Sequence, residues 1–190
     1  MEGGKVTSLH PMPGLALTEA RDAVVAYASH RWPIVPGDPT FLPVVRPCGS
    51  SPSLSVTQAL ESWTHAPYPI LLPCGQGIDA AEIPAGDTHR VVHALRESGA
   101  LGPIILTRHG SWLLLVSSGP PLHPSLGVRV LGAGSWVVLP PTKQYGHPCR
   151  WRVSPQAVDW AIPPRDLLQD ALFRAWRAPV PTEHQRSRSL

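Results

Sequence analysis

Two carboxylates in the segment Gly77-Ile78-Asp79-Ala80-Ala81-Glu82-Ile83-Pro84 are the residues best suited to hold a metal ion. A two-metal phosphoryl-transfer centre needs carboxylates that converge on ions about 4 Å apart. Side chains two residues apart on a strand share a face, whereas Asp79 and Glu82 are three apart, so Ala81 occupies the position of a second carboxylate. A bulge would bring the two acids together; without one, they are ordinary acidic residues at the end of a strand.

Basic and aromatic residues interleave between positions 143 and 152. Arginine beside aromatic side chains can hold phosphates and stack on bases. Lys143, Arg150 and Arg152 are therefore candidate contacts to nucleic acid or nucleotide. A hairpin whose polar face carries Arg150 and Arg152 and whose other face buries Trp151 explains the pattern equally well.

A third set, Cys48, Cys74, His147 and Cys149, has the residue types of a structural zinc site. The chain has no CxxC pair and the separations are long, so the alternative interpretation of Cys48 and Cys74 is that they are small buried apolar residues. The first residues carry no apolar run after their charges, and the number of cysteines is odd. These features predict reduced thiols and a cytoplasmic location.

The composition limits the remaining possibilities. A length of 190 residues suits one domain, and the apolar runs are well short of the roughly 20 residues that cross a bilayer, so we expect no membrane partner. The net charge of +3 permits a nucleic-acid partner without requiring one. P-loop, GxGxxG, HExxH and GxSxG motifs are absent, which argues against the nucleotide-hydrolysis, dinucleotide, zinc-protease and α/β-hydrolase classes.

Short elements must position these residues, because the 24 prolines cannot lie in helix interiors or central strands. Apolar periodicity and end signals predict helices over 17–31, 55–65, 87–98, 155–160 and 165–177, and strands over 32–37, 69–73, 77–83, 104–107, 112–117, 128–131, 136–139 and 150–153. Helices that precede a cluster of hairpins predict an α+β fold, with an antiparallel or mixed sheet flanked by helices. We expect a flexible arm over 1–13, a single domain over 14–177 and a disordered tail over 178–190.

Several motifs also occur in a recognisable order. The segment 73–84, Pro73-Cys74-Gly75-Gln76-Gly77-Ile78-Asp79-Ala80-Ala81-Glu82-Ile83-Pro84, is followed by a helix and by the segments 102–107 and 110–116. After these come Gly134-Ser135-Trp136-Val137-Val138-Leu139-Pro140-Pro141-Thr142 and Arg150-Trp151. From about residue 17 to 155 the chain resembles the bifunctional DNA primase/polymerase N-terminal (prim-pol) domain, and most strongly its short stand-alone actinobacterial members.

The resemblance implies an archaeo-eukaryotic primase-like fold that binds a nucleotide triphosphate and a template and joins nucleotides with two divalent metals. In that family the activity rests on two carboxylates spaced by one residue, a histidine on the next hairpin strand and a third acid. Carried over by position, Asp79 matches the first carboxylate and Ala81 the second, the histidine falls at Trp112 or Leu113, and the third acid falls at about Arg129. His109 is a displaced histidine.

One aspartate beside an arginine is a poor ligand set for Mg²⁺, which needs several anionic oxygens. We therefore expect a degenerate two-metal site in a domain that binds nucleic acid or nucleotide, through Arg129, Lys143, Arg150 and Arg152 along one sheet face, with weak or no nucleotidyl transfer. The first alternative is an active DNA primase/polymerase that uses Mg²⁺ or Mn²⁺ with Asp79 and Glu82 as carboxylates and His109 as the histidine.

The second alternative is a non-catalytic protein-interaction or regulatory module. Its docking element would be the helix over 165–177, whose apolar seam would lie against a partner such as a replication or helicase protein. The competing interpretation of that seam is packing across the domain's own sheet.

Overall fold

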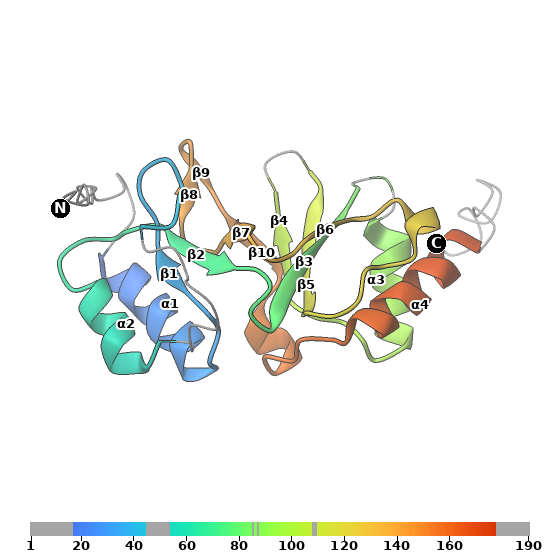
Figure 1. Ribbon diagram of the computed structural model, residues 1–190, viewed down its shortest axis with the longest axis horizontal. Coiled ribbons are helices and arrows are strands. Elements are labelled where there is room, and N and C mark those ends of the chain that lie inside the picture. Colours follow the sequence, from blue (N-terminus) through green and yellow to red (C-terminus); the bar gives the residue numbers. More distant parts are fainter. Residues whose placement is uncertain (1–16, 45–53, 85, 87, 108–109, 178–190) are drawn as a thin grey trace, which may run out of the picture.

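The computed structural model describes residues 17–44, 54–84, 86, 88–107 and 110–177. The predicted arm over 1–13 and the predicted tail over 178–190 lie outside these residues, as do Cys48 and His109. The described chain forms two lobes that lie side by side along the long axis of the molecule (Figure 1). Helices α1 and α2 lie at one end, and α3 and α4 at the other.

The first lobe combines two helices with a three-stranded antiparallel sheet. Its elements are α1 (Leu17–Ser29), α2 (Val56–Ser62) and the strands β1 (Val35–Pro36), β2 (Ile70–Pro73) and β7 (Trp136–Val138), in the order β1-β2-β7. Helix α2 begins with a capping box, in which Ser55 Oγ accepts a hydrogen bond from the Gln58 N–H and the Gln58 side chain accepts one from the Ser55 N–H. The reciprocal pair satisfies two N–H groups that the first turn leaves without partners.

The second lobe is a five-stranded antiparallel sheet with two helices. In spatial order its strands are β10 (Arg150–Val153), β4 (Ile104–Leu106), β5 (Trp112–Ser117), β3 (Ile78–Ile83) and β6 (Arg129–Leu131). Helices α3 (Thr88–Glu97) and α4 (Arg165–Arg177) cover one face of this sheet. Their buried residues, including Leu95, Leu168 and Leu172, pack with Ala81 and Leu114 of the sheet. We call this the helix-covered face.

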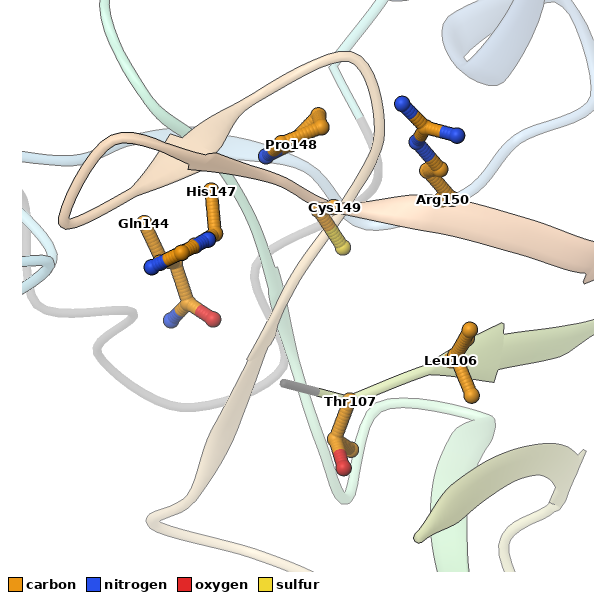
Figure 2. A pocket seen from close by; sticks show the side chains of 7 residues that line it. All are labelled: Leu106, Thr107, Gln144, His147, Pro148, Cys149 and Arg150. Atoms are coloured by element: carbon orange, nitrogen blue, oxygen red, sulfur yellow. The ribbon is translucent and has the colours of Figure 1, made fainter. Parts of the chain in front are cut away.

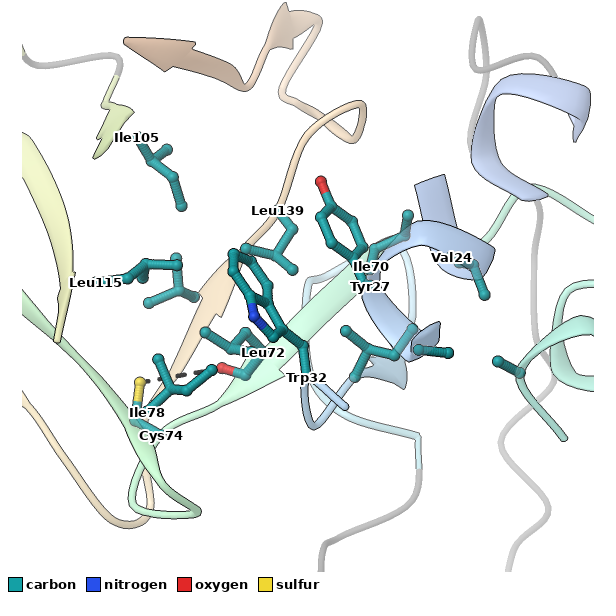
Figure 3. Packing of buried hydrophobic residues seen from close by; sticks show 14 of the residues in the cluster. Val24, Tyr27, Trp32, Ile70, Leu72, Cys74, Ile78, Ile105, Leu115 and Leu139 are labelled. Carbon is teal, nitrogen blue, oxygen red and sulfur yellow. Dashed lines mark hydrogen bonds between the residues drawn. The ribbon is translucent and has the colours of Figure 1, made fainter. Parts of the chain in front are cut away.

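The opposite face packs on the first lobe, and we call it the lobe-facing side. Ala80, Ile105 and Leu115 of the sheet share one buried cluster with Val24 and Trp32 of the first lobe. Figure 3 shows Ile105 and Leu115 on one side of this cluster and Tyr27 on the other. Tyr27 Oη donates a hydrogen bond of 2.6 Å to the Pro140 carbonyl, and burial raises the pKa of Tyr27. The two lobes therefore share this buried cluster.

The observed elements confirm the predicted α+β class, and most predicted elements lie within one or two residues of their observed positions. Three differences have physical causes. The predicted helix over 155–160 is a single 3-10 turn, Pro155–Val158, that ends where Asp159 adopts a positive φ. The predicted strand over 32–37 pairs only at Val35–Pro36. A small hairpin of β8 (Lys143–Gln144) and β9 (His147–Pro148) was not predicted, because its strands are too short for an alternating pattern.

No helix in the described part of the chain has the length and apolar character that crossing a membrane requires.

Candidate functional site

The pairing of β3 decides how its two carboxylates are placed. Each residue from Ile78 to Ile83 pairs in sequence with β5, and no bulge interrupts the register. Asp79 and Glu82 therefore point to opposite faces, because neighbouring side chains on a strand alternate. Asp79 lies on the helix-covered face with Ala81, whereas Glu82 lies on the lobe-facing side. The bulge that would have brought the two acids together is not present in β3.

Asp79 is buried and fully engaged by the protein's own hydrogen-bond donors. Its Oδ1 accepts a hydrogen bond of 2.7 Å from the Gly75 N–H. Its Oδ2 forms a buried ion pair and hydrogen bond with Arg165 Nη2. Arg165 Nη1 also donates to the carbonyls of Gly119 (2.7 Å) and Pro120 (3.0 Å). This network joins the β2–β3 turn, the loop after β5 and the first residue of α4.

Arg165 is a residue whose importance the sequence interpretation missed. A basic residue at the start of a helix is unfavourable, because the N-terminal end of the helix dipole is positive. Arg165 is the first residue of α4, so an arginine at this position indicates a specific acidic partner elsewhere in the chain. Nothing in the sequence alone identifies that partner, because Asp79 is 86 positions away.

Glu82 lies in a different environment, at the margin of the lobe-facing side. The register aligns Glu82 with Leu113 on one neighbouring strand and with Arg129 on the other. Glu82 Oε2 is 3.4 Å from Arg129 Nη1, and the two side chains are 31% and 73% exposed, respectively. Glu82 Oε1 accepts a hydrogen bond of 3.0 Å from Ser111 Oγ, which lies 2.8 Å from Thr107 Oγ1. A polar chain thus runs from Arg129 through Glu82 to Thr107.

These placements separate the positions carried over from the resembled family. Leu113 and Arg129 lie directly opposite Glu82 on the two neighbouring strands, so the three side chains lie on the lobe-facing side. Asp79 and Ala81 lie on the other face, beneath α3 and α4. Arg129 is therefore beside Glu82, and the expectation that it lies beside Asp79 is wrong. The structure therefore places the two carried-over carboxylate positions on one face of the sheet, and Leu113 and Arg129 with Glu82 on the other.

The described residues do not fit a two-metal centre. Such a centre needs several carboxylate oxygens on one side, but Asp79 is engaged by Arg165 and Glu82 by Arg129 and Ser111. Among the residues that the structure describes, no group of three or more His, Cys, Asp or Glu side chains could hold an ion. Cys74, His147 and Cys149 of the candidate zinc set therefore do not form such a group. Cys48 and the candidate catalytic residue His109 lie outside the described residues.

The two described cysteines are free thiols. Burial, and then the nearby Asp79 charge, raise the pKa of Cys74 to about 12. Burial alone raises the pKa of Cys149 to about 12. The Cys149 thiol donates a hydrogen bond of 3.2 Å to the Val138 carbonyl. Both thiols are therefore protonated at neutral pH, which for Cys74 is consistent with the alternative interpretation as a buried apolar group.

A groove lies beside the β8–β9 hairpin, close to these residues. It consists of two adjoining pockets of about 520 and 280 Å³ that share Thr107, Gln144 and Cys149 in their walls. We call the two pockets together the hairpin groove. Figure 2 shows Gln144, His147 and Cys149 on one side of it and Leu106 and Thr107 on the other. Thr107 connects the groove to the polar chain that ends at Glu82 and Arg129.

The four basic candidates do not share one sheet face, so that expectation is wrong. Successive pairings place Arg129 and Trp151 on the lobe-facing side, and Arg150 consequently on the opposite side. Arg150 lines the hairpin groove at the edge of the sheet. The Arg152 guanidinium lies over the Trp112 ring, 5.4 Å from its centroid. Lys143 belongs to the separate hairpin.

Comparison with known proteins gives one family. The family model described as "Bifunctional DNA primase/polymerase, N-terminal" matches residues 24–167. The matched segment contains both lobes except the first turns of α1 and most of α4, and it includes β3, the hairpin groove and Arg165. Among curated proteins, no match to the chain was found.

Proposed function

The chain belongs to the bifunctional DNA primase/polymerase N-terminal family, and from this premise we propose that it is a prim-pol domain that binds nucleic acid or nucleotide and has weak or no nucleotidyl transfer. One observation carries the proposed loss of nucleotidyl transfer. Asp79, which occupies the family's first carboxylate position, is buried in an ion pair with Arg165 beneath the helices. An internal guanidinium therefore takes the place that a metal ion would need.

The residues on the lobe-facing side support the same proposal. Glu82 has no carboxylate directly opposite it, since the paired positions on the two neighbouring strands hold Leu113 and Arg129. Arg129 neutralises that carboxylate and repels a divalent cation, because like charges at close range oppose binding. The same exposed guanidinium suits a phosphate, which it can contact with two parallel hydrogen bonds.

The hairpin groove is the surface that we assign to the ligand. Arg150 contributes a positive charge to its wall, and His147, Gln144 and Thr107 contribute hydrogen-bonding groups. None of the described residues that line the groove is acidic. A cationic groove of this kind attracts the phosphate backbone with little dependence on sequence.

A primer-synthesis and primer-extension assay of the full chain with Mg²⁺ and with Mn²⁺ tests the loss of transfer. We expect no product above that of the same preparation carrying both Asp79→Asn and Glu82→Gln. Robust product that disappears in either single variant would establish the alternative, an active primase/polymerase that uses Mg²⁺ or Mn²⁺ through Asp79 and Glu82. Asparagine is preferred to alanine at position 79, because it keeps hydrogen-bonding groups beside the buried Arg165.

Titration of labelled single-stranded DNA at two salt concentrations tests the proposed binding of nucleic acid. Affinity should fall steeply as salt rises, because phosphate contacts release counterions. Arg150→Ala should weaken binding, whereas Arg96→Ala, which removes an exposed arginine from α3 on the far side of the lobe, should leave it unchanged. No binding at low salt would exclude this half of the proposal.

The alternative of a protein-interaction module loses its docking element. Leu168, Ala171, Leu172 and Ala175 of α4 are buried in the core against α3 and the sheet. The seam therefore packs across the domain's own sheet, as the competing interpretation stated. A replication or helicase protein as a partner would need another surface.

A further inference from the structure

Exposed large apolar side chains gather at the hairpin groove. In the described part of the chain they are Leu42, Leu106 and Tyr145, which are 50%, 39% and 70% exposed, respectively. Leu106 lines the larger pocket of the groove, and Leu42 and Tyr145 line the smaller one. Single exposed apolar residues need no explanation, but a patch of them beside a cavity marks an interaction site.

Tyr145 is displayed by an unusual turn. It lies with Gly146 at the tip of the β8–β9 hairpin, and both residues have positive φ, 51° and 82°. Such two-residue turns favour asparagine, aspartate and glycine, because a side chain is sterically disfavoured at positive φ. A large aromatic ring at this position is costly for folding, and an interaction of the ring with a ligand would explain it.

The neighbouring loop holds this ring at the groove. Phe41 packs edge-on against Tyr145, with ring centroids 5.4 Å apart and planes at 65°. Asp38 fixes the loop, because its Oδ1 accepts hydrogen bonds from the Thr40 N–H (2.8 Å) and the Leu42 N–H (3.0 Å). The edge contact with Phe41 orders the Tyr145 ring while leaving most of it exposed. A pre-ordered aromatic side chain loses little conformational entropy when a ligand binds.

We propose that the hairpin groove binds single-stranded nucleic acid, with an unpaired base stacked on Tyr145 and the adjoining phosphate at Arg150. This inference rests on the proposed nucleic-acid binding and adds the base-stacking residue and the phosphate contact within the groove. Charge complementarity favours this occupant, because Arg150 lines the groove and none of its described lining residues is acidic. Only an unpaired strand offers base faces to an aromatic side chain, since the bases of a duplex are already stacked on one another.

Fluorescence anisotropy with a labelled oligothymidylate, and with a blunt duplex of the same length, tests the inference at low salt. We expect the full chain to bind the single strand about tenfold or more tightly than the duplex. Tyr145→Asn should weaken single-strand binding by about tenfold, since one base stacked on an aromatic ring contributes on this order. Asparagine tolerates positive φ, so this variant removes the ring and preserves the turn. Tyr145→Phe, which keeps the ring, should bind as the unmodified chain does.

The outcomes separate this inference from the proposed function. Equal affinity for duplex and single strand, or single-strand binding that Tyr145→Asn leaves unchanged, would overturn the inference while nucleic-acid binding stands. Absence of binding to either oligonucleotide would overturn both. A second copy of the chain as the occupant would appear as a dimer in analytical ultracentrifugation that Leu42→Ser dissociates. That result together with no oligonucleotide binding would also overturn the inference.

Discussion

Asp79 and Glu82 are three residues apart on one strand, and the two faces of the sheet give them opposite environments. Asp79 lies beneath α4, where Arg165 and the Gly75 N–H engage both of its oxygens. Glu82 lies at the margin of the lobe-facing side, where Arg129 is 3.4 Å away and mostly exposed. Both acids have an arginine partner, but one pair is enclosed by protein and the other is in contact with water.

The comparison indicates why β3 can contain two carboxylates without forming a metal-binding site. On the helix-covered face, Arg165 links Asp79 to the loop carbonyls of Gly119 and Pro120, so the carboxylate has a structural role. On the lobe-facing side, Arg129 leaves Glu82 accessible but neutralised. Neither face offers the cluster of anionic oxygens that two divalent ions require.

The largest expected effect is on the helix-covered face. Asp79→Ala should lower the free energy of unfolding by about 3–5 kcal/mol, because it leaves the buried Arg165 charge without its partner. Urea denaturation followed by tryptophan fluorescence measures it. Glu82→Ala is the matched control on the other face, and its cost should stay below about 1 kcal/mol.

The double variant Asp79→Leu with Arg165→Met distinguishes an unpaired charge from a general loss of packing. Replacement of both partners by apolar residues is often close to neutral, so this variant should regain most of the lost stability. A double variant that is as unstable as Asp79→Ala would contradict the assignment of the effect to the buried arginine.

Two leucine truncations extend the comparison from charge to packing. Leu172 of α4 is fully buried, and Leu172→Ala should cost about 2–5 kcal/mol. Leu113 lies beside Glu82 in the wall of the hairpin groove and is half-buried, so Leu113→Ala should cost clearly less. Both values come from the same urea measurement. Equal costs would show that the lobe-facing margin is as tightly packed as the helix-covered face.

Most of the fold was predictable because its elements carry local signals. The short runs 112–117 and 150–153 are separated from their neighbours by Gly, Pro or Ser clusters, and 165–177 has an apolar seam. These signals gave the observed bounds of β5, β10 and α4. The β8–β9 hairpin was missed, since two-residue strands carry no periodicity and Tyr145 is not a typical residue for its turn.

The candidate site was less predictable, because it depends on pairings between distant segments. The spacing of Asp79 and Glu82 correctly predicted opposite faces in a regular strand. The face shared by Glu82, Leu113 and Arg129 depends on the registers of β3 with β5 and β6, which no local pattern fixes. The partnership of Asp79 with Arg165 depends on where α4 packs, and it is therefore a property of the folded chain.

A smaller effect is the pH dependence of the free energy of unfolding that the Cys74 thiol contributes. Because the pKa of Cys74 is raised to about 12, the folded chain holds this proton more tightly than the unfolded chain does. Its stabilising contribution is complete below the ordinary thiol pKa, near 9, and is lost as the pH rises toward 12. The free energy of unfolding should therefore fall above about pH 9, by at most about 1.4 kcal/mol per pH unit for this thiol.

Alkylation by iodoacetamide in a Cys48→Ser background separates the two thiols. Asp79→Asn should make Cys74 react at lower pH, because the Asp79 charge contributes to its raised pKa, whereas Cys149 should not change. An equal change at both cysteines would indicate general loosening of the fold rather than the loss of one charge.

The smallest expected effect is at the exposed pair. Glu82→Gln keeps the shape of the side chain and its acceptor for Ser111, and removes only the charge that faces Arg129. Its cost should be below about 1 kcal/mol and should shrink further in high salt, because solvent screens a pair of which one partner is 73% exposed. Asp79→Asn should cost more and should respond little to salt, since its partner is buried. Urea titrations at low and high salt compare the two variants directly, and an equal salt response at both positions would remove the distinction between the two faces.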